Sequence, residues 1–276
     1  MRPCVRTSCN GASIAARDSS ATVEIPGAFC FDAFKGRGAG YRIFVYCPQV
    51  SPPPSGFPVM YVLDGNATFG TAVDTVALQM KRTKSTGVPP CIIVGIGYPT
   101  PDLIDIQRRQ HDYTPAGAPA FSDFVENELK PALQARLPID PEMQALFGHS
   151  LGGLYTVWSL FTRPHTFRSY MAASPSFWWN DRVVLKYEAR FLRHLYASTR
   201  TPRLLVTAGS LEGVPPQLPT TAFARSMAED AALMVARLRW RAGARLQVSF
   251  VELTDETHAS VIPAAISRSV RFAWAT

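Results

Sequence analysis

Apolar residues in this chain follow two patterns: short unbroken runs, and longer segments in which they recur every three or four positions. Runs of about four to eight residues are typical of strands buried on both faces, and the longer pattern is typical of helices with one buried face. The runs predict strands at 58–63, 91–98, 169–173, 203–208 and 246–253. The periodic segments predict helices at 67–81, 121–135, 222–240 and 263–274, and an amphipathic helix ending near residue 198. Pro131 should kink the second helix, and the polar stretch 100–119 should be a loop.

The order of these elements predicts an α/β fold. Strands alternate with helices, which favours a mostly parallel central sheet with helices on both faces. Two further strand-like segments, 21–34 and 41–47, are joined by the glycine-rich stretch 35–40, so we expect an antiparallel hairpin at the start of the sheet. Residues 1–20 are small and polar, and we expect them to be disordered. No repeat or change of composition divides the remainder, so residues 21–276 are predicted to form one domain.

The sequence Gly148-His149-Ser150-Leu151-Gly152 lies between an apolar run and the helical stretch 154–161. It fits Gly-x-Ser-x-Gly, in which a serine occupies a sharp turn between a strand and a helix. The flanking glycines leave room that a Cβ would block, which holds Ser150 Oγ clear of the sheet. The N–H of Leu151, at the amino end of the helix, would stabilise negative charge on the carbonyl under attack. The motif therefore predicts a nucleophilic serine.

A serine hydroxyl is nearly inert at neutral pH, so this hypothesis requires a base within hydrogen-bond reach. His149 lies inside the motif, where it cannot turn back onto Ser150. Three other histidines are unsuitable, because His111 and His165 fall in the wrong part of the chain and His194 lies in a predicted helix. His258 follows the last strand, where the α/β-hydrolase order of nucleophile, acid and base places the base. We expect His258 to accept the Ser150 proton and return it to the leaving alcohol.

Two further parts of the site are less specified by the sequence. Glu212 follows the strand at 203–208, where a carboxylate could orient the imidazole; Asp255 or a Ser-His dyad without a strong acid are the alternatives. Gly65 follows the strand at 58–63, and we expect its N–H to be the second oxyanion donor. In the alternative reading, the neighbours Asp64 and Asn66 simply form a turn and cap the next helix.

Composition narrows the class of protein. With 47% hydrophobic and 18% charged residues, the chain can bury a sizeable core. The net charge is +7, but Lys and Arg are scattered, which argues against a nucleic-acid partner and weakly favours an anionic substrate. The five cysteines include no CxxC arrangement, and no segment is apolar enough for a signal peptide or a membrane span. We therefore expect a cytoplasmic protein without a membrane partner, or a periplasmic one if a leader has been removed.

Five segments together resemble the esterase family of α/β hydrolases that includes esterase D, feruloyl esterases, mycolyltransferases and siderophore esterases. The segments are YVLDGNA at 61–67, RRQHDYTP at 108–115, GHSLGG at 148–153, SPSFWW at 174–179 and ETHASVIP at 256–263. Within this family the chain is most similar to the trilactone siderophore esterases, those acting on enterobactin, salmochelin and bacillibactin. The resemblance implies Ser150 and His258 as nucleophile and base, and the N–H groups of Gly65 and Leu151 as the oxyanion hole. It also implies that the acid can be weak or absent.

The same resemblance suggests residues for the substrate pocket. The guanidinium groups of Arg108 and Arg109 could bind catecholate or carboxylate oxygens, and the rings of Trp178 and Trp179 could stack on catechols. Arg109 could equally form an internal ion pair with Asp112, and the tryptophans could belong to the core.

These observations predict a serine esterase that uses an acyl-serine intermediate and needs no metal or organic cofactor. The expected substrate is a siderophore trilactone, whose iron would be part of the substrate. The alternatives are an esterase for small acyl or feruloyl esters, or an acyltransferase. A non-catalytic binding protein with the hydrolase fold is disfavoured because both Ser150 and His258 are present.

Overall fold

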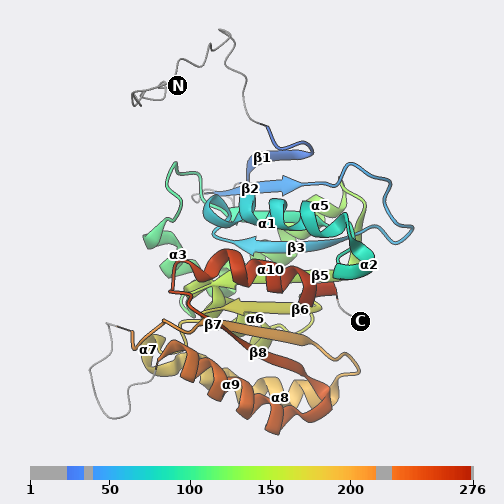
Figure 1. Cartoon of the computed structure of the whole chain (residues 1–276). Coiled ribbons are helices and arrows are strands. Elements are labelled where there is room, and N and C mark those ends of the chain that lie inside the picture. Colours follow the sequence, from blue (N-terminus) through green and yellow to red (C-terminus); the bar gives the residue numbers. More distant parts are fainter. Residues whose placement is uncertain (1–23, 34–39, 216–225, 275–276) are drawn as a thin grey trace, which may run out of the picture.

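A mixed sheet forms the centre of the structure, a computed structural model that describes residues 24–33, 40–215 and 226–274 (Figure 1). The strands are β1 (Ala28–Ala33), β2 (Tyr41–Tyr46), β3 (Phe57–Leu63), β4 (Ile92–Gly97), β5 (Ile139–His149), β6 (Ser169–Ala173), β7 (Arg203–Gly209) and β8 (Gln247–Leu253). Within the described residues these eight strands form one sheet in the order β1-β2-β4-β3-β5-β6-β7-β8. The pairs β1–β2 and β2–β4 are antiparallel and the other pairs are parallel, which confirms the predicted sheet with its antiparallel start.

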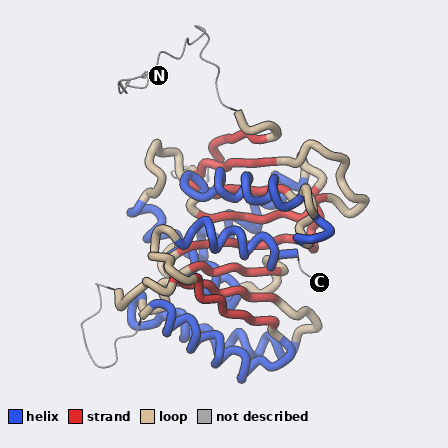
Figure 2. Tube along the Cα trace, in the orientation of Figure 1, coloured by secondary structure: helices blue, strands red, loops and turns tan. Residues whose placement is uncertain are grey.

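Helices cover both faces of this sheet (Figure 2). They are α1 (Gly65–Met80), α2 (Thr83–Thr86), α3 (Ile106–Asp112), α4 (Ala118–Phe124), the π-helix η1 (Val125–Leu129), α5 (Lys130–Gln134), α6 (Leu151–Thr162), α7 (Trp179–Arg182), the 3-10 helix η2 (Val183–Tyr187), α8 (Glu188–Ala197), α9 (Met227–Ala242), the 3-10 helix η3 (Gly243–Arg245) and α10 (Val261–Trp274). Helices α1 and α10 pack together on one face, whereas α4, α6, α8 and α9 contribute to the core on the other.

Strand β3 shows why its apolar run does not alternate with polar residues. Val59, Tyr61 and Leu63 belong to the core on the α6 side, and Met60 and Val62 to the core beneath α1 and α10. Every residue of β3 is buried. A strand with helices over both faces needs apolar side chains at every position, so the run itself encodes the layered fold.

The structure corrects two expectations about the middle of the chain. The stretch 100–119 is not all loop, because it contains α3 and the start of α4; the Asp105 carboxylate caps α3 by accepting the Arg108 N–H. The distortion expected at Pro131 takes the form of the π-helix η1, in which the Lys130 N–H bonds to the Val125 carbonyl. The wider turn comes directly before the proline, whose missing N–H and bulky ring do not fit a regular α-helix. The predictions for residues 1–20 and for the turn 35–39 lie outside the described residues.

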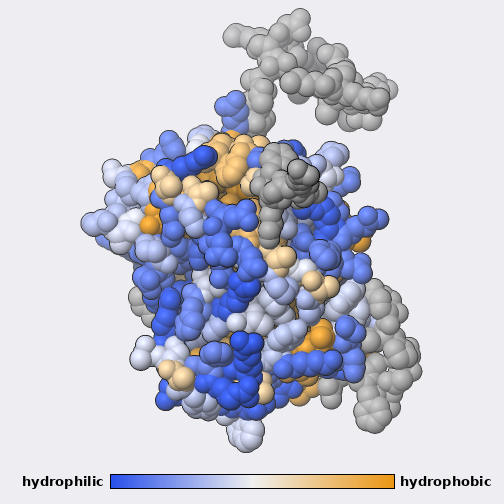
Figure 3. Space-filling model, turned by 180° about the vertical axis from the view of Figure 1, so that it is seen from behind, coloured by the Kyte–Doolittle hydropathy of each residue, from blue (hydrophilic) through white to orange (hydrophobic). Residues whose placement is uncertain are grey.

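Charged and polar residues cover most of the face seen in Figure 3, and apolar ones gather near the edge strand β1. Phe29 on that strand is half exposed. Among the described helices, none is both long and apolar enough to cross a bilayer.

Helix α10 follows the loop that carries His258, and its packing should be needed for stability. Ile266 of α10 is fully buried, whereas Ile106 of α3 is 71% exposed. We expect Ile266→Ala to lower the free energy of unfolding by about 2–5 kcal/mol and Ile106→Ala to change it by less than about 0.5 kcal/mol. Urea denaturation of both variants would measure this, and equal losses would contradict the packing described for α10.

Candidate active site

Ser150 occupies a strained turn between β5 and α6. Its backbone has φ 60° and ψ −117°, a conformation that residues other than glycine seldom adopt. Its N–H donates to the Ala173 carbonyl at 2.9 Å, and its own carbonyl accepts the Leu154 N–H at 2.9 Å. A Cβ at Gly148 would collide with the Gly152 carbonyl, so the tight turn requires glycine there. This is the strand–turn–helix arrangement that presents a serine hydroxyl at the edge of a parallel sheet.

Two helix amino ends meet beside this serine. Strands β3 and β5 are parallel neighbours, so α1, after β3, and α6, after β5, begin at the same edge. A Cβ placed on Gly152 of α6 would lie 3.6 Å from Asp64 Oδ2, which shows how closely the two turns approach. Gly65 and Leu151 are the first residues of these helices, and such N–H groups have no acceptor within their own helix. Both can therefore serve a negatively charged oxygen.

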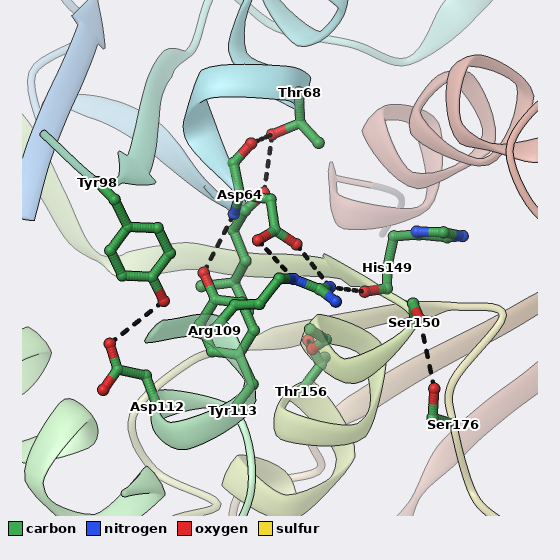
Figure 4. A network of polar contacts seen from close by, with 12 residues as sticks. Asp64, Thr68, Tyr98, Arg109, Asp112, Tyr113, His149, Ser150, Thr156 and Ser176 are labelled. Atoms are coloured by element: carbon green, nitrogen blue, oxygen red, sulfur yellow. Dashed lines mark hydrogen bonds and ion pairs between the residues drawn. The ribbon is translucent and has the colours of Figure 1, made fainter. Parts of the chain in front are cut away.

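A buried ion pair holds the β3–α1 turn against the end of β5 (Figure 4). Arg109 donates from Nε and Nη2 to the two carboxylate oxygens of Asp64, at 3.0 and 2.9 Å. The same Nη2 reaches the His149 carbonyl at 3.3 Å, and the Tyr113 hydroxyl accepts the Asp64 N–H at 3.2 Å. Burial alone would lower the pKa of Arg109, but the Asp64 carboxylate outweighs it and raises that pKa, so the guanidinium stays charged.

This arrangement corrects the substrate-binding role expected for Arg109. Its side chain is only 11% exposed and is already engaged, so the internal ion pair considered as an alternative is present, with Asp64 as partner instead of Asp112. Asp112 instead accepts from the Tyr98 hydroxyl at 3.2 Å. Arg108 donates to the Gly40 carbonyl at 2.7 Å and lies over the Tyr98 ring, 4.5 Å from its centroid. Neither arginine belongs to the described residues that line the cavity beside Ser150.

The side chains of Asp64 and Asn66 do not cap α1, which was the alternative considered for them. Asp64 has φ 53°, and its side chain makes no cap hydrogen bond. The Asn66 side chain accepts the Tyr98 N–H at 2.9 Å and donates to the carbonyls of Tyr98 and Thr100. It thereby fastens the end of β4 to the start of α1.

Glu212 and His258 meet through a short hydrogen bond. His258 Nδ1 lies 2.7 Å from Glu212 Oε2, while Oε1 of the same carboxylate accepts from Ser174 Oγ at 2.5 Å and from the Gly209 N–H at 2.7 Å. Burial raises the pKa of Glu212, but these three hydrogen bonds outweigh it and hold that pKa below 4.5. The Glu212 side chain is 1% exposed and His258 is 45% exposed. A fixed carboxylate thus lies behind an accessible imidazole. Asp255, the other acid considered, is exposed.

Ser150 and His258 face a common cavity of about 370 Å³. The described residues around it are Ser150, Ser176, Trp178, Leu211, Glu212, Gly213, Val214, Pro215, Met227 and His258. The Ser150 hydroxyl lies 3.4 Å from that of Ser176, and among the described residues no hydrogen bond joins it to His258. Trp178 lines the cavity; Trp179 packs partly against the core, with its ring centroid 5.8 Å from that of Trp178.

Sequence reasoning missed Ser174 and Ser176. Ser174 directly follows β6, the parallel neighbour of β5, and Ser176 comes two residues later. Polar residues just after adjacent parallel strands meet at one edge of the sheet, and this pattern could have identified them. The Asp64–Arg109 pair had no comparable signal, because its two residues are far apart in the sequence and in no shared pattern.

The Asp64–Arg109 pair should stabilise the chain strongly. In Asp64→Asn a buried guanidinium would lose its countercharge, and we expect the free energy of unfolding to fall by about 3–5 kcal/mol. Asp32→Asn removes the carboxylate of the more exposed Arg42–Asp32 pair and should lower the free energy of unfolding far less. Urea denaturation would compare the two variants. A loss in Asp64→Asn no larger than that in Asp32→Asn would mean that Arg109 is not held as described.

The lowered pKa of Glu212 predicts a pH dependence of stability. The folded chain favours the ionised carboxylate, so this contribution is fully present above pH 4.5, the ordinary pKa, and is lost as pH falls through the lowered folded-state pKa. Glu212→Gln lacks it. The difference in Tm between wild type and Glu212→Gln should stay constant above about pH 6 and shrink below about pH 4.5. A difference that grew on acidification would contradict the assignment.

Comparisons with known proteins agree with this geometry. The family model described as "Putative esterase" matches residues 37–239. The chain is 35% identical over 251 residues to the ferri-bacillibactin esterase BesA of Bacillus subtilis (strain 168), covering 84% of each chain. It is also 35% identical over 282 residues to the siderophore triacetylfusarinine C esterase of Aspergillus fumigatus, covering 92% of this chain and 95% of that one.

A solved structure extends the likeness to the whole fold. The crystal structure of the BES protein from Bacillus cereus superposes with a TM-score of 0.86 at 34% identity, covering 95% of this chain and all of that one. The match of the family model and the fold that carries Ser150 point to hydrolysis of carboxylic esters. The chain belongs to this esterase family of the α/β-hydrolase fold.

Proposed function

We propose that this esterase opens a siderophore trilactone through an acyl-Ser150 intermediate. The observation that carries the proposal is that Ser150 and the His258–Glu212 pair face one cavity, beside the amino ends of α1 and α6. A nucleophile, a base fixed by a carboxylate, and N–H groups for an oxyanion are the parts that acyl transfer requires.

The reaction begins with Ser150 turning from Ser176 toward His258 Nε2. A hydroxyl has three staggered positions about its Cβ, and hydrogen bonds of the free enzyme are often loose before substrate binds. As Nε2 takes the proton, Ser150 Oγ attacks the ester carbonyl, and the oxyanion is stabilised by the N–H groups of Leu151 and Gly65. Glu212 keeps the proton on Nδ1 and stabilises the imidazolium.

The tetrahedral intermediate then collapses, and its C–O bond to the alcohol breaks. His258 gives its proton to the departing alcohol oxygen, which leaves the acyl group on Ser150. Water attacks the acyl-serine, again with His258 as base, and releases a carboxylic acid and the free Ser150 hydroxyl. An alcohol in place of water would give acyl transfer.

The substrate class is supported by the relatives and by the cavity. The names of the two relatives describe esterases for ferri-bacillibactin and triacetylfusarinine C, both siderophores. In this chain Trp178, Leu211, Val214 and Met227 give the cavity a largely apolar lining, suited to the organic part of a chelate. Iron would enter as part of the substrate. A cytoplasmic location, expected from the cysteine pattern, remains a prediction.

Hydrolysis of a ferric trilactone would test the proposal. We expect wild type to open it to linear products and Ser150→Ala to be slower by about 10³-fold or more. Ser55→Ala, which removes an exposed hydroxyl in a loop, should match wild type. Mass spectrometry would follow the ring-opened products, with p-nitrophenyl butyrate as the simple ester for comparison.

Two results would change the proposal. A strong preference for the simple ester would favour a general esterase over a siderophore esterase. Equal rates for wild type and Ser150→Ala would remove the acyl-serine mechanism.

A further inference from the structure

A second imidazole packs directly against His258. His149 is the last residue of β5, and its ring centroid lies 4.5 Å from that of His258, with an angle of 43° between the ring planes. His149 is 9% exposed, so it contacts the accessible base from the protein interior.

Burying this histidine carries a cost. Its Nε2 is inaccessible to solvent and has no hydrogen-bond partner among the described residues. Burial, together with the nearby His258 and Arg109, lowers the pKa of His149 to about 3, although Glu212 acts in the opposite direction. The ring is therefore neutral at physiological pH.

The backbone of His149 is firmly held on the other side. In Figure 4 its ring points away from Arg109, while its carbonyl accepts from Arg109 Nη2 at 3.3 Å. The sheet register pairs His149 with Ala173 of β6. His149 is thus fixed in the sheet and lies between the turn of Asp64 and the loop of His258.

The loop around His258 is mostly exposed, and its backbone is held by the loop that follows β7. The Leu211 N–H donates to the Glu256 carbonyl at 3.0 Å. Such bonds fix the backbone and leave the direction of the His258 ring to its side-chain contacts. Glu212 holds one edge of the imidazole through Nδ1. A single hydrogen bond leaves the ring free to swing about it, and the His149 ring lies where it limits that movement.

We propose that His149 is a positioning residue that holds the imidazole of His258 in the orientation needed for proton transfer. The proposal rests on His258 being the base of the proposed function. His149 limits rotation of the His258 ring by direct ring contact. Because it stays neutral, it adds no charge repulsion when His258 becomes an imidazolium during the reaction.

Variants at position 149 would test this ring contact. His149→Asn removes the ring, whereas His149→Phe keeps an aromatic ring of similar size. His165→Phe changes an exposed histidine away from the site and is the matched control. We expect His149→Asn to lower kcat for p-nitrophenyl butyrate by about 10- to 100-fold, with KM changed by less than about two-fold. His149→Phe should recover most of this loss, and His165→Phe should match wild type.

A spectroscopic measurement distinguishes positioning from a merely structural role. The proton shared by His258 and Glu212 should give a low-field ¹H NMR resonance in wild type, which weakens or shifts in His149→Asn. Unchanged kcat in His149→Asn, or a fall in kcat and Tm with the resonance unaltered, would overturn the proposal. If His149→Asn does not fold, His149→Ala decides by the same readouts.

Labelling with a fluorophosphonate keeps the two proposals apart. Failure to label wild type at Ser150 would reject the acyl-serine mechanism itself. Normal labelling of wild type with an equally fast reaction in His149→Asn would reject only the role of His149.

Discussion

The shared edge of the parallel strands is the constraint on which this site depends. Strands β3, β5, β6, β7 and β8 run in the same direction, so the chain leaves each of them at the same side of the sheet. The groups of the site follow these ends in turn: Asp64 after β3, Ser150 after β5, Ser174 after β6, Glu212 after β7 and His258 after β8. Among the described residues, none of the side chains proposed to react lies in the interior of a helix. The helices contribute the N–H groups of their first turns, which a sheet of this kind gathers at one place.

Backbone strain is concentrated at this edge. Asp64, Ser150, Ser174 and Asp255 all have positive φ and directly or closely follow strands. Such conformations cost about 1–3 kcal/mol each and persist only where the surroundings enforce them. Here the sheet does so, because its hydrogen bonding continues past the strand ends: the Ser150 N–H bonds to Ala173 and the Ser174 N–H to Thr207. Neighbouring strands thus support one another's functional turns.

The parts of the site that could be predicted from sequence are those encoded locally. Ser150 lies in a motif whose glycines and flanking apolar runs specify the turn, and His258 and Glu212 were found as polar residues just after predicted strands. The layered sheet followed from the same runs. The partner of Arg109 could not be found in this way, since Asp64 is distant in the sequence and the nearby Asp112 was the more obvious choice. The helix α3 was missed because its exposed face is apolar at Ile106 and its buried face holds Arg109 and Asp112, which reverses the usual pattern.

The placement of Arg109 changes where selectivity can arise. With its charge matched by Asp64 and withdrawn from solvent, the guanidinium supports the β3–α1 turn. Under the proposed function, recognition would then fall to the cavity lining, which includes Trp178, Leu211 and Met227. The exposed His258 also needs contacts on its buried side. In the proposed mechanism its imidazole must reach both the nucleophile and the leaving alcohol, so it cannot be enclosed and its orientation has to come from one side only. Glu212, 1% exposed, lies on that side, and the open cavity lies on the other. The site therefore has buried polar groups on one side of His258 and an apolar, accessible cavity on the other. In the proposed reaction, a bulky ester would approach from the cavity without displacing the groups that hold His258.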